Sequence, residues 1–301
     1  MDNFEKKSLT VVIPAYNEGE ALAVILPELL VYAQKKNWKI IIVNDGSEDN
    51  TKEILNKYAG YGHLKTIHHK LNGGYGRAIK SGIEAVDTEY MTTIDADGQH
   101  NFKDIDKLQE SITVHDADMV VGAREGIYST SKFRGGGKWL IRHVAKLLMT
   151  VDIYDINSSM KIYQSQLAKQ YIHLFPDSMA FSDVITLIFI KNKHYVLETP
   201  IEINNRIAGK STGRTNGTNS VLQTIMEILN IIVFFNPMKI FLPTALVFII
   251  LGLAWGIPMI LKGEGVTVGM SLLIIMGIFS FLLGLIAEQL SEIRKKIENR
   301  K

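Results

Sequence analysis

Two long uncharged stretches near the carboxyl end constrain this chain more than any other feature of its sequence. Residues 240–261 and 265–287 are rich in Leu, Ile, Phe and Val, and only Lys262-Gly263-Glu264 separates them. Each exceeds the roughly 20 residues that a helix needs to cross a bilayer core. A buried helical hairpin of a soluble protein is the alternative, but such long apolar runs exceed what a soluble core usually needs. The stretches therefore predict two transmembrane helices joined as an antiparallel hairpin.

Basic residues flank the outer ends of this predicted hairpin. They are Arg206, Lys210, Arg214 and Lys239 before it, and Arg294, Lys295, Lys296, Arg300 and Lys301 after it. By the positive-inside rule, both termini and the large amino-terminal part then lie in the cytoplasm, with a cytoplasmic tail over 289–301. Residues 221–235 carry a bulky apolar face, so we expect an amphipathic helix over 218–237, either in the membrane interface or packed on the preceding domain.

Charge and cysteine content limit the functions open to residues 1–217, the predicted cytoplasmic domain. The 301-residue chain has 33 basic and 31 acidic side chains, so no global field favours a nucleic acid partner. There is no cysteine, which excludes disulfides and thiolate metal sites. Residues 1–8 are charged and lack the apolar core of a signal peptide.

Short apolar runs alternate with helical patterns over the first 121 residues. The runs at 9–13, 39–43, 65–68, 90–94 and 118–121 predict strands, and the patterns at 18–35, 51–58, 76–85 and 102–114 predict helices. This order predicts an α/β fold with a doubly wound, mainly parallel sheet. Ligands of such sheets bind beyond the carboxyl ends of the strands. Three of those ends are polar, at 14–18, 44–47 and 95–99.

Two carboxylates follow the predicted strand at 90–94. Asp95 and Asp97 can both turn toward one hard cation, and Gln99 can supply a further oxygen. All-oxygen ligation suits Mg²⁺ or Mn²⁺, which usually also contacts substrate phosphates. The alternative is an ordinary turn, because Asp-Gly is a common turn pair. The position at the end of a central strand favours the metal site.

The three polar segments together carry a family resemblance. Val-Val-Ile-Pro-Ala-Tyr-Asn-Glu at 11–18, Asn-Asp-Gly-Ser at 44–47 and Asp-Ala-Asp-Gly-Gln-His at 95–100 occur in this order. They resemble the family 2 glycosyltransferases of the GT-A fold, and within them the dolichyl-phosphate mannose synthases and their bacterial polyprenyl-phosphate relatives. The likeness covers about residues 9–211 and then the paired membrane helices. Asn44 and Gly98 depart from it, since many members have Asp and Leu there.

The resemblance implies roles for particular residues. The nucleotide sugar would be bound by Pro14, Tyr16, Glu18, Val43, Asp45, Asp95, Ala96, Asp97, Arg206 and Lys210. Mg²⁺ or Mn²⁺ would be held by Asp95, Asp97 and Gln99. Arg124, Arg134 and Lys138 would hold an acceptor phosphate, since guanidinium groups suit phosphate oxygens. For Arg134 alone, a solvated surface arginine is the alternative.

Asp183 occupies the place where many family 2 enzymes carry a general base. A hydroxyl acceptor needs one, whereas a lipid phosphate is already an anion near pH 7, so Asp183 is either a base or structural. The implied catalytic residues are thus Asp97, Arg124, Arg134 and Asp183.

The implied activity is transfer of mannose or glucose, from GDP-mannose or UDP-glucose, to a dolichyl or undecaprenyl phosphate at the membrane. A hydroxyl or glycan acceptor and a catalytically dead lipid-binding scaffold remain alternatives, and a homo-oligomer is left open. A processive synthase is disfavoured because no Gln-x-x-Arg-Trp motif occurs. The glycine-rich segment at 72–77 matches neither nucleotide-binding fingerprint.

Overall fold

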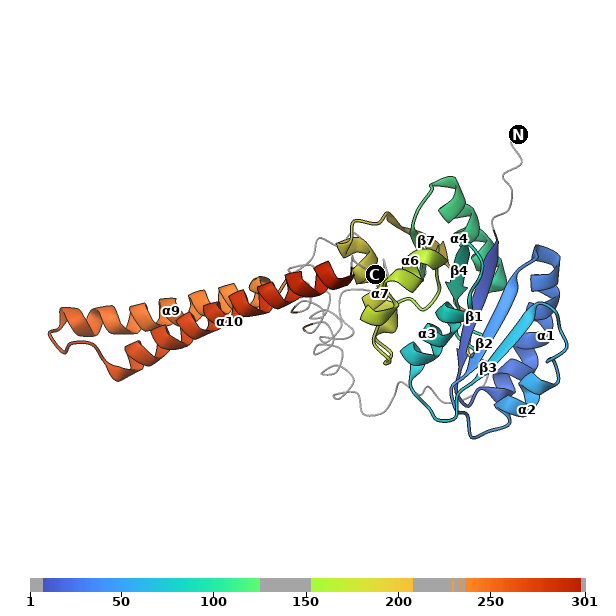
Figure 1. Cartoon of the computed structure of the whole chain (residues 1–301), viewed down its shortest axis with the longest axis horizontal. Helices are drawn as coiled ribbons and strands as arrows, with labels where there is room; N and C mark the ends of the chain where they lie inside the picture. Colours follow the sequence, from blue (N-terminus) through green and yellow to red (C-terminus); the bar gives the residue numbers. More distant parts are fainter. Residues whose placement is uncertain (1–7, 125–152, 208–228, 230–232, 234–235, 299–301) are drawn as a thin grey trace. The chain divides into compact units, whose positions relative to one another are not determined.

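The fold has two compact units, a sheet domain and a helical hairpin (Figure 1). The computed structural model describes residues 8–124, 153–207, 229, 233 and 236–298. Within these residues the sheet domain holds seven strands and the hairpin holds two helices.

The seven strands form one sheet with the order β3-β2-β1-β4-β6-β5-β7. Their bounds are Leu9–Ala15 (β1), Lys39–Asn44 (β2), Leu64–His68 (β3), Tyr90–Thr93 (β4), Met119–Arg124 (β5), Lys161–Gln164 (β6) and Val196–Ile201 (β7). All neighbouring strands run parallel except at β6, which is antiparallel to both β4 and β5. The mainly parallel sheet predicted from the sequence is confirmed.

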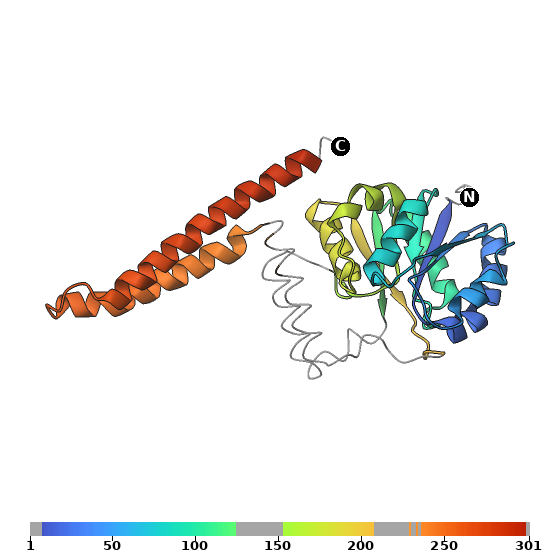
Figure 2. The same cartoon turned by 60° about the horizontal axis from the view of Figure 1, so that its bottom comes forward.

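Helices cover both faces of the sheet, as the buried, β-branched strands require (Figures 1 and 2). One face carries α1 (Gly19–Lys36), α2 (Thr51–Asn56) and α4 (Phe102–Val114); the other carries α3 (Tyr75–Ala85), α6 (Ser165–Gln170) and α7 (Phe181–Lys191), with a 3₁₀ turn at Ile172–Leu174. Val11 and Ile13 of β1 join the core beneath α1 and α4. Val12, between them, points to the opposite face and touches Gly82 of α3. The alternation of side chains along a strand thus supplies both layers.

The strand order has a topological switch point between β1 and β4. From β1 the chain crosses first toward β2 and β3, and α3 then returns it to β4 on the other side of β1. Connections therefore leave the carboxyl ends of β1 and β4 in opposite directions, which is where open α/β sheets bind ligands. The polar segments after β1, β2 and β4 all lie at this edge.

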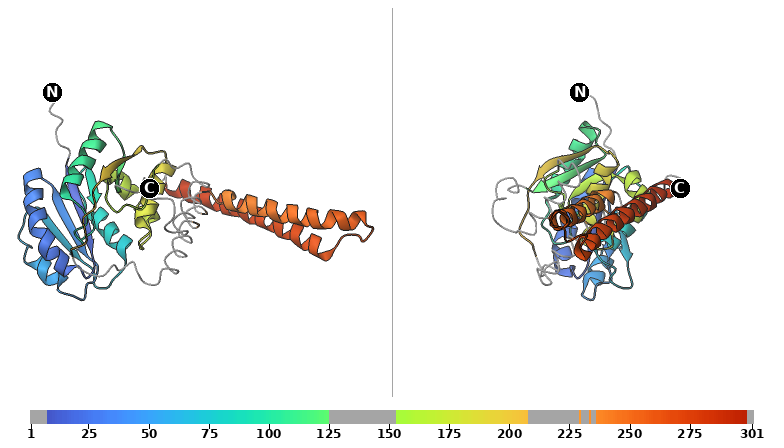
Figure 3. Two further views of the ribbon diagram at one scale, coloured as in Figure 1. Left: turned by 180° about the vertical axis from the view of Figure 1, so that it is seen from behind. Right: turned by 90° about the vertical axis from the view of Figure 1, so that its left-hand side faces the viewer.

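The hairpin consists of α9 (Met238–Leu261) and α10 (Val268–Glu298), which run side by side in every view (Figure 3). Small residues set their spacing: Gly252 faces Leu273, and Gly256 faces Met270. Met238–Leu261 and Val268–Ile293 have mean hydropathies of 2.4 and 2.5, so both are long and apolar enough to cross a membrane. Close packing through glycines is typical of helix pairs in lipid.

The predicted bounds need small corrections. The connector runs over 262–267 and is longer than the three residues expected, because the helix at 265–287 begins only at Val268. Helix α10 continues to Glu298, so the predicted tail is helical there. The helix expected over 218–237 lies almost wholly outside the described residues, and β6, α6 and α7 were not predicted.

Candidate active site

The carboxylates of Asp95 and Asp97 lie directly beyond β4, as the sequence predicted. The Asp97 side chain is 9% exposed and that of Asp95 is 30% exposed. Burial raises the pKa of Asp97, and the nearby Asp95 carboxylate raises it further. The backbone N–H of Gln99 donates to Asp97 Oδ1 at 3.0 Å, which closes a turn and brings Gln99 beside the two acids.

Asp95 is held as an anion by three surrounding side chains. Ser159 Oγ donates to Asp95 Oδ2 at 2.6 Å, and Tyr75 Oη donates to Oδ1 at 3.1 Å. His100 Nε2 lies 3.5 Å from Oδ2. Burial alone would raise the pKa of Asp95, but the hydrogen bonds from His100, Ser159 and Tyr75 lower it below its ordinary value.

An extended segment after β7 covers the acidic loop. The Asn204 N–H donates to the Gln99 carbonyl at 2.9 Å, and the Ile207 N–H donates to the Asp97 carbonyl at 3.1 Å. Ile207 lies against Gly98, whose φ of +78° and missing Cβ leave room for it. A leucine at position 98 would meet the Ile207 side chain, so this contact and the positive φ both favour glycine there.

Arg206 of this covering segment bridges the ends of β1 and β4. Its Nη2 donates to Glu18 Oε1 at 2.5 Å, and its Nε lies 3.8 Å from Asp97 Oδ2. Burial raises the pKa of Glu18, and Arg206 partly offsets that rise. Glu18, Asp97 and Arg206, all predicted to bind the nucleotide sugar, are therefore brought together.

The loops after β1 and β2 are bonded to each other around the start of α1. Asn17 has a φ of 54°, and its Oδ1 accepts the Glu48 N–H at 2.8 Å. Asp49 Oδ2 accepts the Gly19 N–H at 3.0 Å, where a carboxylate also suits the helix dipole. Tyr16 is half-buried, and Pro14, Val43 and Ala96 are buried positions at the same edge.

Asp45 is 3% exposed and is bonded within the protein. Its carboxylate accepts the N–H of Gly73 at 3.1 Å and of Gly74 at 2.8 Å, and His69 Nδ1 lies 2.6 Å from Oδ1. Contact of Asp45 with a base or ribose stays a prediction. The contacts described make it the residue that shapes the 72–74 loop.

The 72–74 loop connects the residues that follow β2 to those that follow β4. Gly74 has a φ of +100°, and a Cβ there would lie 2.5 Å from the Asp177 carbonyl. The next residue, Tyr75, starts α3 and reaches Asp95. The loop thus joins Asp45, directly after β2, to Asp95, which follows β4. Paired glycines between a strand and a helix were the available signal.

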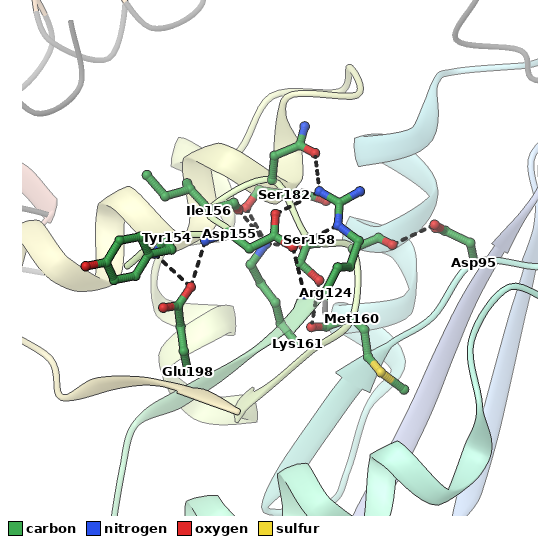
Figure 4. A network of polar contacts seen from close by, with 12 residues as sticks. Asp95, Arg124, Tyr154, Asp155, Ile156, Ser158, Met160, Lys161, Ser182 and Glu198 are labelled. Atoms are coloured by element: carbon green, nitrogen blue, oxygen red, sulfur yellow. Dashed lines mark hydrogen bonds and ion pairs between the residues drawn. The ribbon is translucent and has the colours of Figure 1, made fainter. Parts of the chain in front are cut away.

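Arg124 ends β5 and is held by a residue that the sequence analysis missed. Its Nε donates to Asp155 Oδ2 at 2.8 Å, and its Nη2 donates to Asp155 Oδ1 at 2.7 Å and to Asn157 Oδ1 at 3.2 Å (Figure 4). These hydrogen bonds raise the pKa of Arg124 further, so it stays charged. Glu198 Oε1 in turn accepts the Asp155 N–H at 2.7 Å.

The remaining predicted site residues are Asp183, which the structure describes, and Arg134, Lys138 and Lys210, which it does not. Asp183 lies in the first turn of α7, next to Ser182, whose carbonyl accepts from the buried Lys161. Arg134, Lys138 and Lys210 lie outside the described residues. Their assignment to phosphate binding stays a prediction.

The acidic pair fits a hard divalent cation by the chemistry of its donors. Among the described residues, no three His, Asp or Glu side chains surround one position, so a cation here would take Asp95, Asp97 and further oxygens from Gln99, water or phosphate. The raised pKa of Asp97 points the same way, because its burial and then the neighbouring Asp95 carboxylate both disfavour its negative charge until a cation is added.

Comparison with solved structures identifies the fold. Glucosyl-3-phosphoglycerate synthase from Mycobacterium tuberculosis, crystallised with Mn²⁺, uridine diphosphate and phosphoglyceric acid, superposes with a TM-score of 0.59 at 14% identity. The match covers 75% of this chain and 78% of that chain. Another crystal structure of that synthase holds Mg²⁺ and uridine diphosphate. The likeness confirms the GT-A fold.

Comparison with protein sequences identifies the family. Dolichyl-phosphate beta-glucosyltransferase ALG5C of Trichomonas vaginalis is 27% identical over 251 residues, which are 75% of this chain and 71% of that protein. Dodecaprenyl-phosphate galacturonate synthase of Rhizobium johnstonii is 25% identical over 173 residues, 56% of this chain and 51% of that protein. Residues 236–293 match the GtrB C-terminal hairpin, and residues 10–175 match glycosyl transferase family 2. The chain belongs to glycosyl transferase family 2 and is a glycosyltransferase.

Proposed function

We propose that this protein transfers a hexose from a nucleotide-diphosphate sugar to a polyprenyl phosphate, such as dolichyl or undecaprenyl phosphate, to give a lipid-linked monophosphate sugar. The observation that carries the proposal is the presence, in one chain, of the acidic pair at the β1–β4 switch point and of two helices suited to a membrane. Relatives named for dolichyl and dodecaprenyl phosphate support the same acceptor class.

We propose that the nucleotide-sugar donor binds at the acidic pair, Asp95 and Asp97. Asp95 and Asp97 would hold Mg²⁺ or Mn²⁺, with Gln99 beside them, and the cation would neutralise charge on the donor diphosphate. Arg206 adds a fixed positive charge at the same place through its contacts with Glu18 and Asp97. Tyr16 and the loop shaped by Asp45 would hold the nucleoside.

We propose that the acceptor phosphate binds at Arg124. Within the described residues the hydrogen bonds of its guanidinium group involve Nε and Nη2, so we assign Nη1 to the acceptor phosphate. Arg134, Lys138 and Lys210 are proposed to add charge around the two substrates. A phosphate monoester is already an anion near pH 7, so it needs no general base, and Asp183 then has a structural role.

The reaction is a single displacement. A phosphate oxygen of the lipid forms a bond to the anomeric carbon as the bond from that carbon to the nucleoside diphosphate breaks, which inverts the anomeric centre. The protein contributes position and charge stabilisation.

Glucose is favoured over mannose as the hexose, and UDP-glucose over GDP-mannose as the donor. The support comes from relatives that are named for glucosyl transfer. The cytoplasmic placement of the sheet domain and both termini remains part of the proposal, and it rests on the basic residues that flank the hairpin.

A donor panel tests the proposal. Purified full-length protein in detergent is mixed with Mg²⁺ or Mn²⁺, undecaprenyl phosphate, and radiolabelled UDP-glucose or GDP-mannose. We expect label in the lipid phase with UDP-glucose, abolished by EDTA and by Asp97→Ala. Transfer only to a sugar or glycan acceptor would refute the lipid acceptor and make Asp183 the candidate base. Absence of any transfer by folded protein would favour a scaffold.

A further inference from the structure

The segment 155–159 contacts both Arg124, at the end of β5, and Asp95, after β4. At one end Asp155 accepts two hydrogen bonds from the Arg124 guanidinium, at 2.7 and 2.8 Å. At the other end Ser159 Oγ donates to Asp95 Oδ2 at 2.6 Å. Five consecutive residues therefore connect Arg124 of β5 to Asp95, which follows β4.

The buried side chain of Lys161 donates hydrogen bonds to the main chain of this segment (Figure 4). It is 1% exposed, and its Nζ donates to the carbonyls of Ile156 at 2.9 Å, of Ser158, and of Ser182 at 2.8 Å. A buried ammonium group is costly unless its protons are bonded, and it has three of them. Three carbonyls thus satisfy it, and two of these belong to the 155–159 segment.

Along the 155–159 segment, the residues whose carbonyls accept from Lys161 alternate with the residues whose side chains contact Arg124 or Asp95. Positions 156 and 158 are held from within by Lys161, while Asp155 and Asn157 contact Arg124 and Ser159 contacts Asp95. Turning either carbonyl to find another partner would rotate the adjoining peptide planes and move these side chains. Loss of the ammonium group therefore reaches Arg124 and Asp95 without any contact between Lys161 and a substrate.

We propose that Lys161 is a positioning residue, which fixes Arg124 relative to Asp95 by holding the main chain of the 155–159 segment. An ordinary buried lysine would stabilise the fold without affecting one side chain of the site in particular. The inference deepens the proposed function and rests on the role that it gives to Arg124.

A double-mutant cycle separates the two roles. The full-length protein is compared with Lys161→Met, Arg124→Ala and the double variant, using UDP-glucose and farnesyl phosphate as a short acceptor. We expect Lys161→Met to lower kcat/KM for the acceptor at least about tenfold in the parent, but less than about threefold when Arg124 is already absent. Equal losses in both backgrounds would overturn the proposal.

A second readout needs no catalysis. Calorimetric binding of farnesyl phosphate in EDTA should weaken several-fold in both Lys161→Met and Arg124→Ala. The control is Lys169→Met, because Lys169 Nζ also donates to a main-chain carbonyl, that of Val86 at 2.5 Å, but lies outside this network. It should leave binding and transfer unchanged. If Lys169→Met weakens binding as much as Lys161→Met, the role is general stabilisation and the proposal fails.

Two further outcomes of these experiments are interpreted separately: an unfolded Lys161→Met variant and an unaffected Arg124→Ala variant. If Lys161→Met does not fold, as judged by its melting temperature, Ser159→Ala replaces it in the cycle, because it cuts the link to Asp95 at the surface of the same segment. Additivity of Ser159→Ala with Arg124→Ala would then overturn the proposal. If Arg124→Ala itself leaves transfer and farnesyl phosphate binding unaltered while the parent is active, the proposed acceptor site fails, and the inference fails with it.

Discussion

The two sides of the site balance their charge in different ways. Beyond β4, burial raises the pKa of Asp97 and of Glu18 on the neighbouring loop, and Arg206 only partly offsets this. At the end of β5, by contrast, Arg124 and Asp155 neutralise each other through paired hydrogen bonds. The acidic side is thus arranged to receive positive charge from outside, whereas the arginine side is already balanced and serves geometry.

The largest expected effect is on the acidic side. Asp97→Asn keeps the shape of the side chain and removes the charge, so we expect transfer to fall by at least about a hundredfold, as when charge stabilisation is lost at a reacting centre. Radiolabel transfer measures it. Asp116→Asn is the matched control, because Asp116 is exposed in a turn with a φ of 49°, which Asn tolerates. A loss below about threefold for Asp97→Asn would remove the distinction between the two sides.

Asp155→Asn tests the arginine side. The amide keeps one acceptor oxygen but turns an NH₂ toward Arg124, and losing a charge-assisted hydrogen bond costs about 2 kcal/mol. We expect kcat/KM for the lipid phosphate to fall about thirtyfold, with the KM for the nucleotide sugar changed less than threefold.

Glu198→Gln is the control for that variant, because its remaining oxygen can still accept the Tyr154 and Asp155 N–H groups that Oε1 accepts now. An equal rise in both KM values would show that Asp155 supports the whole site rather than Arg124.

The acidic side could be predicted from the sequence because its residues are close together along the chain. Asp95, Asp97 and Gln99 follow one apolar run, and the strand ends at 14–18 and 44–47 bring their partners to the same edge of a parallel sheet. Only Arg206 comes from far away, and the resemblance to a family supplied it. For Asp95, Asp97 and Gln99, the local sequence pattern and the sheet topology were sufficient to predict the site.

On the arginine side only Arg124 was predicted, from the family resemblance, because tertiary contacts assemble the rest. Arg124, Asp155, Lys161 and Glu198 come from separate segments, and β6 enters the sheet antiparallel, which local periodicity does not indicate. A lysine is also expected at the surface, yet Lys161, the first residue of β6, is buried, and main-chain carbonyls accept the hydrogen bonds of its ammonium group. Only the three-dimensional arrangement reveals such a partner set.

Tyr75→Phe asks how far the acidic side depends on its own supports. Burial favours protonation of Asp95, and the Tyr75 hydroxyl is one of the donors that oppose it. Without that hydroxyl we expect Mn²⁺ binding to weaken about tenfold, at the lower end for groups that orient metal ligands. Titration of free Mn²⁺ by electron paramagnetic resonance measures it. Tyr61→Phe, at a 51% exposed position, should change nothing. Unaltered Mn²⁺ binding in Tyr75→Phe would mean that Ser159 and His100 suffice.

The smallest effect is a pH dependence of stability that arises on the arginine side. Burial lowers the pKa of Lys161 from its usual 10.5 to about 8; Arg124 lowers it too, while Asp183, Asp155 and Asp95 oppose the shift. Between these two values the unfolded chain binds the proton more tightly than the folded one, so the free energy of unfolding rises with pH. From pH 7.5 to 9 the Lys161 contribution should grow by about 1 kcal/mol, or about 3 °C in melting temperature.

Melting curves of the parent and Lys161→Met across this pH range measure that contribution, since groups common to both proteins cancel in the difference. The parent should gain stability relative to the variant as pH rises. A constant difference would mean that the 155–159 segment is held by an ammonium group whose pKa lies far above 9, so that the carbonyls and the nearby carboxylates compensate its burial in full. In that case the arginine side, like the acidic side, would owe its arrangement to charge as much as to geometry.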